Sequence, residues 1–258
     1  KIVKVDSKDT KKKLKNVEFI VYKGTDSNKC MTLYKNGKKL ENIIGTKIDV
    51  ENVYTVKFNS NVTNATRILT DDNGSITIKG MECGTYTFKE VSNSNYGYSK
   101  MLTETVNINN PKVIKTVTIK NEKKVGDLNI DKSDDKNTNK KLSNVEFVIM
   151  SSYNKKYIKV KATGNQVTND NDGWATKIIG TATIVDMTYT ANKEEATKFV
   201  TDSQGKMSAK DLLSSSNGSD EIKYNLIETY NPNPMYNADY KSGYISLGTN
   251  TIQATNHQ

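Results

Sequence analysis

The chain has 258 residues, of which 26% are charged and 34% hydrophobic, and its mean hydropathy is −0.69. No apolar run approaches the roughly 18 to 20 residues of a membrane-spanning helix, so we expect a soluble protein with no membrane partner. The net charge of +9 comes almost entirely from lysine, with Arg67 as the one arginine. Proteins that read DNA bases often use bidentate arginine contacts, and proteins that bind single strands use basic grooves with interleaved aromatic residues. The sequence shows neither pattern, so we expect no nucleic acid partner.

Residues that usually bind metals or act as nucleophiles are scarce. Cys30 and Cys83 fit no metal-ligand spacing, and His257 is the one histidine. The sequence therefore predicts no metal, no cofactor and no Cys–His nucleophile pair. The two cysteines either form a disulfide or remain reduced thiols, and the sequence leaves both alternatives open.

The first half of the chain has the pattern of short strands separated by turns. Alternating apolar residues begin in KIVKVD (1–6) and continue in NVEFIV (16–21). After the turn LTDDNG (69–74) they return in YTFKEV (86–91) and VTIKN (117–121). Short strands with turn residues at close spacing are typical of a β-sandwich.

The second half repeats the first. KKLKNVEFIV (12–21) matches KKLSNVEFVI (140–149), and LTDDNG matches VTDSQG (200–205). YTFKEV then matches YNLIET (224–229), and VTIKN matches TIQATN (251–256). Two copies of one domain therefore follow each other.

From this repeat we predict an all-β protein of two tandem Ig-like β-sandwich domains, at residues 1–123 and 124–258. The second domain is expected to carry an insertion around 151–198, which faces a comparable but dissimilar stretch in the first. The one plausible helical stretch is Asn192–Lys198.

Strand periodicity places a polar residue on the apolar face of three strands in each domain. In the first strand of the first domain, Val3 and Val5 make the register ambiguous, and the match of Lys4 to Lys132 decides it. Each core is then expected to hold one lysine, one glutamate and one asparagine. The two sets are Lys4, Glu90 and Asn121, and Lys132, Glu228 and Asn256.

Two interpretations of these sets remain open. The first is a buried Lys–Glu ion pair with a hydrogen-bonded asparagine, which is costly to desolvate. The second is chemical: burial lowers the pKa of an amine and raises that of a carboxylic acid, so a buried pair can become neutral. A neutral amine beside a carboxamide can attack it, with Glu90 and Glu228 as catalysts, to give an amide between two side chains.

This pattern resembles the Cna-B-type (SpaA-like) isopeptide-bonded domains of Gram-positive sortase-assembled pilins and surface adhesins. The resemblance rests on four features of each domain: K-x-D in the first strand, L-x-N-V-E-F in the segment after it, Y-x-F-x-E or Y-x-L-x-E in a strand near the end of the domain, and a last strand that ends in Asn. It implies bonds from Lys4 to Asn121 and from Lys132 to Asn256. The family often follows its Glu with Pro and then Gly-Tyr; EVSNSNYGY lacks the Pro, and ETYNPNPMY lacks the Gly.

The resemblance also implies a function. It predicts a shaft subunit of a wall-anchored, extracellular pilus, joined by sortase to neighbouring pilin subunits, and no enzyme acting on an external substrate. No Tyr-Pro-Lys or LPxTG-like motif occurs in the chain, so polymerisation rests on the resemblance alone. The alternative is an ancillary pilin or adhesin that binds a host matrix protein through the aromatic residues of 151–198, which are Tyr153, Tyr157, Trp174 and Tyr189.

Overall fold

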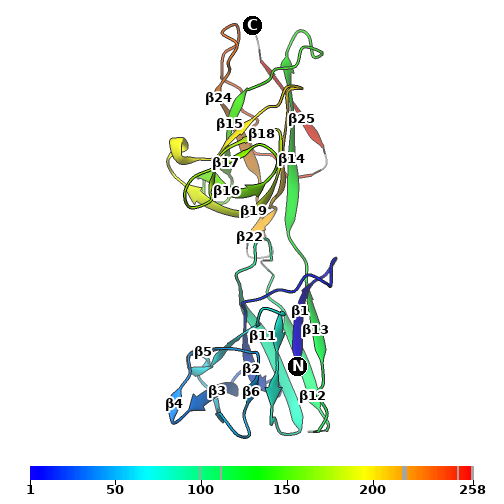
Figure 1. Ribbon diagram of the computed structural model, residues 1–258, viewed down its shortest axis with the longest axis vertical. Helices are drawn as coiled ribbons and strands as arrows, with labels where there is room; N and C mark the ends of the chain where they lie inside the picture. The colour runs from blue at the N-terminus through cyan, green and yellow to red at the C-terminus, as the bar shows by residue number, and fades with distance from the viewer. Residues whose placement is uncertain (99, 111, 217–219, 249, 257–258) are drawn as a thin grey trace. The chain divides into compact units, whose positions relative to one another are not determined.

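The chain divides into two compact units, Lys1–Lys123 and Lys124–Gln258. The computed structural model describes residues 1–98, 100–110, 112–216, 220–248 and 250–256 (Figure 1). In those ranges the only helices are two turns of 3-10 helix, η1 (Val62–Asn64) and η2 (Lys193–Glu195), and every other regular element is a strand. None of these helices is long or apolar enough to cross a bilayer. The predicted all-β class is confirmed.

The first unit is built from a large sheet, a three-stranded sheet and a strand pair. The large sheet has the order β12-β11-β2-β3-β4, with β7 against β3, β8 against β2 and β5 against β8. The small sheet has the order β13-β1-β9, and β10 pairs with β6. The strands are β1 (Ile2–Asp6), β2 (Val17–Lys23), β3 (Cys30–Lys35), β4 (Lys38–Lys39), β5 (Asn42–Ile44), β6 (Ile48–Asp49), β7 (Thr55–Asn59), β8 (Arg67–Leu69), β9 (Ser75–Ile76), β10 (Ile78–Lys79), β11 (Gly84–Asn93), β12 (Thr103–Ile108) and β13 (Val117–Asn121).

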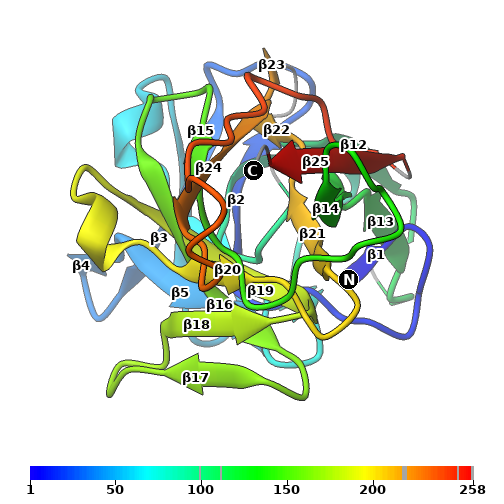
Figure 2. The same cartoon turned by 90° about the horizontal axis from the view of Figure 1, so that it is seen from above.

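The second unit joins its layers into one hydrogen-bonded path. Its order is β17-β18-β20-β15-β16-β19-β21-β14-β25, with β24 against β15, and a separate pair of β22 and β23. Strand β17 is the outer edge of this path (Figure 2). The strands are β14 (Val125–Asp134), β15 (Glu146–Ser151), β16 (Tyr157–Thr163), β17 (Val167–Asn169), β18 (Ala175–Ile179), β19 (Thr181–Thr190), β20 (Lys198–Val200), β21 (Lys206–Leu213), β22 (Ser215–Ser216), β23 (Asp220–Glu221), β24 (Tyr224–Tyr230) and β25 (Thr251–Asn256).

In each unit the first and last strands are parallel neighbours (Figure 1). Lys4 of β1 is in register with Ile119 of β13, two residues before Asn121. In the same way, Lys132 of β14 is in register with Ala254 of β25, two residues before Asn256. Because side chains alternate along a strand, each lysine and its asparagine lie on the same face.

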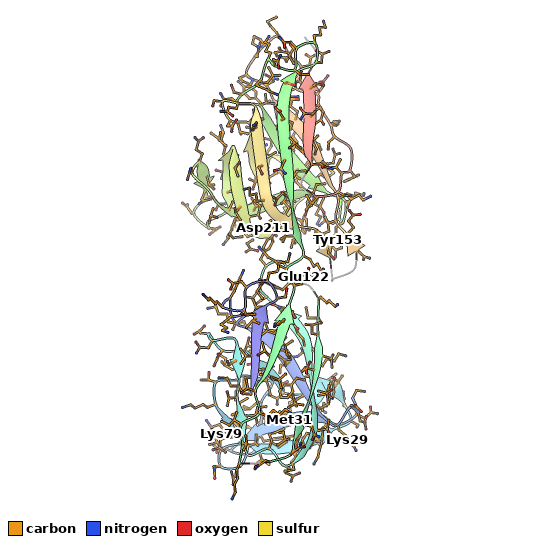
Figure 3. All side chains as sticks on the ribbon, turned by 90° about the vertical axis from the view of Figure 1, so that its right-hand side faces the viewer. Lys29, Met31, Lys79, Glu122, Tyr153 and Asp211 are labelled. Atoms are coloured by element: carbon orange, nitrogen blue, oxygen red, sulfur yellow. The ribbon has the colours of Figure 1, made fainter. Side chains whose placement is uncertain are left out.

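Alternation along these strands also fills the cores. Tyr86, Phe88 and Glu90 of β11 are buried, whereas Lys89 between them is exposed. Buried apolar side chains fill the space between the layers of the first unit, and Met31 lies in this core (Figure 3). Other buried residues of that core are Ile2, Leu14, Val17, Phe19, Val21, Leu33, Ile48, Ile68 and Ile76.

Several elements of the stretch 151–198, which was predicted to contain an insertion, have counterparts in the first unit. Strand β16 pairs antiparallel with β19 as β3 does with β7. Strand β18 pairs parallel with β20 as β5 does with β8, and a 3-10 turn precedes both β20 and β8. The two stretches differ in residue type and strand length, and the second also pairs β17 with β18 and β19 with β21.

The predicted helical stretch Asn192–Lys198 is wrong in extent. Only Lys193–Glu195 is helical, as a 3-10 turn whose N-cap, Asn192, accepts a hydrogen bond from the N–H of Glu194. Ala196 returns to an extended backbone and leads into β20. Asn61 caps η1 in the same way, so this turn too is common to both units.

The two cysteines are separate thiols. Cys30 is buried, and its Sγ donates to the backbone oxygen of Asn59 over 3.0 Å. Cys83 is exposed.

One buried hydroxyl distinguishes the second core from the first. Ser133 follows Lys132 and is fully buried, and among the described residues its Oγ has no hydrogen-bond partner. The repeat places Val5 at the equivalent position of the first unit, where it is also buried. A buried hydroxyl without a partner loses its hydration and gains nothing in return.

We therefore expect Ser133→Val to raise the free energy of unfolding of the second unit by about 1–2 kcal/mol. Trp174 is the one tryptophan of the chain and lies in this unit, so its fluorescence during urea denaturation reports the change. The reverse substitution, Val5→Ser, is expected to destabilise the first unit in calorimetry. An unchanged or lower urea midpoint for Ser133→Val would contradict this expectation.

Candidate functional site

The structure brings together the three predicted residues in each unit. Lys4 lies on β1, Glu90 on β11 and Asn121 on β13, and all three are buried in the first core. The equivalent residues of the second unit lie on β14, β24 and β25 and are also buried; they are Lys132, Glu228 and Asn256. The site therefore joins the first strand, the last strand and a strand of the facing layer.

In the first unit each of the three side chains contacts the other two. Lys4 Nζ donates to Asn121 Oδ1 over 2.5 Å and lies 2.9 Å from Glu90 Oε2. Asn121 Nδ2 donates to Glu90 Oε1 over 2.9 Å and to the backbone oxygen of Lys100 over 3.1 Å. The backbone N–H of Leu102 donates to Glu90 Oε2 over 3.2 Å.

The second unit has the same arrangement. Lys132 Nζ donates to Asn256 Oδ1 and, over 3.1 Å, to Glu228 Oε2. Asn256 Nδ2 donates to Glu228 Oε1 and to the backbone oxygen of Asn237, both over 2.7 Å. Corresponding atoms are thus paired in both units.

A glycine turn supports the backbone of each lysine. Gly74 has φ +64° and accepts a hydrogen bond from the N–H of Lys4 over 2.7 Å. A Cβ at Gly74 would lie 2.6 Å from the backbone oxygen of Lys4. Gly205 has φ +71° and makes the same contact with Lys132. The left-handed conformation and the close approach both require glycine, which explains why LTDDNG and VTDSQG share it.

Burial lowers the pKa of Lys4 and of Lys132, and the charge of the neighbouring glutamate offsets only part of that effect. An aromatic ring lies near each amine: Lys4 Nζ lies 5.9 Å from the ring centre of Phe19, and Lys132 Nζ lies 4.8 Å from that of Tyr240. An amine with a lowered pKa in contact with a carboxylate can transfer its proton and become a nucleophile.

A buried Asp–Tyr pair beside each site was not predicted. Tyr98 Oη donates to Asp6 Oδ2 over 2.7 Å, and Tyr236 Oη donates to Asp134 Oδ2 over 2.6 Å. Each aspartate also accepts two backbone N–H groups of the loop that follows it. The sequence signal was the K-x-D match, in which the aspartate is in register with the asparagine of the candidate site.

We also searched the structure for a metal site and for the position of the one histidine. No group of three or more potential metal ligands occurs among the residues that the structure describes. His257 lies outside the described residues. The candidate site is therefore the repeated set of lysine, glutamate and asparagine.

Comparisons with known proteins agree with this fold. The family model described as the SpaA prealbumin-like fold domain matches residues 1–123. This match spans the whole of the first unit. No curated protein matches the chain in a sequence search.

Solved structures extend the SpaA-like fold to the whole chain. The D295N mutant of the shaft pilin SpaA from Lactobacillus rhamnosus GG is 18% identical, with a TM-score of 0.51, over 99% of this chain and 96% of that one. A second structure of that shaft pilin is 17% identical, with a TM-score of 0.50, over 99% and 95%. At these identities the likeness shows a shared fold.

The Asp6–Tyr98 pair of the first unit should contribute to stability in a pH-dependent way. Burial alone would raise the pKa of Asp6, but the hydrogen bonds from Tyr98 and from the N–H groups of Asp9 and Lys8 outweigh it, so the pKa is lowered. A carboxyl whose pKa falls on folding stabilises the fold above its unfolded pKa of about 3.9, and this contribution is lost as the pH falls further.

We expect Tyr98→Phe to lower the melting temperature at pH 7, and we expect this deficit to shrink as the pH falls below about 4. Calorimetry between pH 7 and pH 2.5 measures both. Tyr54→Phe is the matched control and should show no deficit, since no hydrogen bond is observed from its hydroxyl in the described structure. A deficit that is the same at every pH would contradict the role of Asp6.

Proposed function

We propose that this chain is a structural subunit of a cell-surface pilus whose two units are each closed by an autocatalytic Lys–Asn isopeptide bond. One observation carries the proposal: the same buried lysine, glutamate and asparagine connect the first and last strands of both units. Such repetition is hard to explain as stabilisation by ion pairs, because a buried ion pair contributes little after desolvation.

The contacts support a balanced reaction. Lys4 first transfers a proton from Nζ to Glu90 Oε2, and the neutral amine then attacks Cγ of Asn121. A C–N bond forms, the C–Nδ2 bond breaks, and Nδ2 leaves as ammonia. Nζ gives up two protons in all: one departs with the ammonia by way of the carboxyl group, and the other remains on Glu90. Folding supplies the proximity, so no external substrate or second enzyme takes part.

A bond at this place would change the stability of each unit. The bond would join two residues that are 117 positions apart in the first unit and 124 positions apart in the second, and would close the chain between them into a loop. By analogy with disulfides, a loop of that size removes unfolded-state entropy worth roughly 4.7 kcal/mol. An amide is also indifferent to reductants, unlike a disulfide.

The bond would also change how each unit carries force. Because first and last strands are parallel neighbours, tension would enter at Lys4, cross the bond and leave at Asn121. The intervening chain would bear no load. This property suits a shaft subunit joined by sortase to neighbouring pilin subunits on a Gram-positive cell wall, and we propose that role on the strength of the family resemblance.

A second candidate is an ancillary pilin or adhesin that binds a host matrix protein. Tyr153 lies at the surface of the second unit, 56% exposed, and its ring centre is 6.3 Å from that of Tyr189 (Figure 3). Trp174 and Tyr157 are half-buried, and Lys161 covers the indole. Immunogold labelling of intact cells separates the two roles: label along fibres supports the shaft, and single label at tips or on the wall supports the second candidate.

Intact-mass measurement tests the bonds. We expect the wild-type chain to be lighter than its sequence by two ammonia molecules. Glu90→Ala and Glu228→Ala should each restore one of them, because each removes the proton relay of one unit.

Glu18→Ala is the matched control, since Glu18 pairs with Arg67 away from the site. It should leave the deficit at two ammonia molecules. A wild-type mass equal to that of the sequence would exclude isopeptide bonds and support the simple buried ion pair.

A further inference from the structure

Each catalytic glutamate has a partner that the proposed reaction does not use. Asn93 Nδ2 donates to Glu90 Oε1 over 3.1 Å, and Asn231 Nδ2 donates to Glu228 Oε1 over 3.3 Å. Both asparagines stand three positions after their glutamate, in EVSN and ETYN. The contact is therefore present twice in one chain, on the same carboxyl oxygen.

The orientation of each asparagine amide is fixed by a backbone donor. The N–H of Asn95 donates to Asn93 Oδ1 over 3.0 Å, and the N–H of Asn233 donates to Asn231 Oδ1 over 3.1 Å. A backbone N–H can only donate, so the atom facing it must be the amide oxygen. The amide nitrogen must then face the glutamate.

A β-bulge allows Glu90 and Asn93, which are three positions apart, to face the same side of the sheet. In a regular strand, residues i and i+3 face opposite sides of the sheet. Strand β11 shifts register between Glu90 and Ser92, so that Glu90 pairs with Phe19 and Asn93 pairs with Val17. Phe19 and Val17 share the buried face of β2, and Glu90 and Asn93 therefore share it too. The pairing of β24 with β15 shifts register in the same way: Phe147 pairs with Glu228 and Glu146 with Tyr230, so the extra residue lies on β24.

The two oxygens of each carboxyl have different neighbours. Oε2 faces the amine, whereas Oε1 faces the carboxamide that is to be attacked. Two of the donors to each carboxyl are thus reacting groups, which cannot hold it in place while they themselves change.

We propose that Asn93 and Asn231 are positioning residues for bond formation, an inference that rests on the proposed function. Each amide holds its glutamate with Oε2 toward the lysine and Oε1 toward the asparagine that loses ammonia. Neither residue exchanges a proton or forms a bond to the reactants.

The two units should depend on this contact to different degrees. Glu90 also accepts the backbone N–H of Leu102, a second donor that takes no part in the reaction. For Glu228, Asn231 is the only non-reacting donor found among the described residues. Loss of Asn231 should therefore slow bond formation more than loss of Asn93.

Refolding kinetics of the full chain test the inference. Chains recovered unfolded from inclusion bodies are diluted into buffer at pH 7, quenched in acid at intervals, and digested, and ammonia loss is assigned to each unit from the cross-linked peptides. We expect Asn231→Ala to slow the second unit by about tenfold or more, the effect of one hydrogen bond to a charged group. The first unit of the same chain serves as the internal reference and should react at the wild-type rate.

Two further variants separate positioning from folding. Asn233→Ala keeps the backbone N–H that orients Asn231 and should react at the wild-type rate. Asn231→Asp keeps the shape but not the donor, so it should be as slow as Asn231→Ala at pH 7. When refolding is carried out at mildly acidic pH, above that of the quench, its rate relative to wild type at the same pH should recover, because a protonated carboxyl can donate to Oε1.

The possible results distinguish failure of the positioning role from failure of the proposed function. A wild-type rate for Asn231→Ala or for Asn231→Asp at pH 7 overturns the positioning role, and so does an equal loss in Asn233→Ala. If the wild-type chain itself loses no ammonia, the proposed function fails and this inference fails with it. Ammonia loss in wild type with no effect of Asn231→Ala overturns this inference alone.

Discussion

An amine held away from water between the first and last strands is the constraint on which the rest of each unit depends. An isolated buried ammonium is too costly to persist, so it must be paired, neutralised or consumed. Among the residues that the structure describes, its polar partners in each unit are a carboxyl and a carboxamide, and both come from other strands. The sandwich therefore brings three polar side chains together as a direct result of folding, and the proposed bond would remove the charge that makes their burial unfavourable.

The two units keep this set while much around it differs. The layers are separate sheets in the first unit and one continuous path in the second. Leu102 donates to the carboxyl in the first unit, whereas the ring of Tyr240 lies over the amine in the second. Val5 and Ser133 occupy equivalent buried positions. What is unchanged is the parallel pairing of first and last strands with a two-residue offset between lysine and asparagine, which is the geometry that a load-bearing link would need.

Strand periodicity and the internal repeat were enough to predict the all-β fold and to select the six site residues, because burial on a sheet follows a period of two. The same rule concealed Asn93 and Asn231, since a β-bulge changes which residues share a face. The stretch 151–198 was predicted to contain an insertion because its sequence differs from its counterpart, although β16 pairs with β19 as β3 does with β7. Backbone hydrogen bonds set that pairing, and many sequences satisfy them. The partners of Asp6 and Asp134 are tyrosines about a hundred positions away, which no local pattern indicates.

A crystal structure at atomic resolution would test the central claim most directly, through the electron density between the lysine Nζ and the asparagine Cγ in both units. The account predicts continuous density with the length and planarity of an amide, and no density for the asparagine Nδ2. Well-ordered but separate side chains at Lys4 and Asn121, or at Lys132 and Asn256, would contradict it.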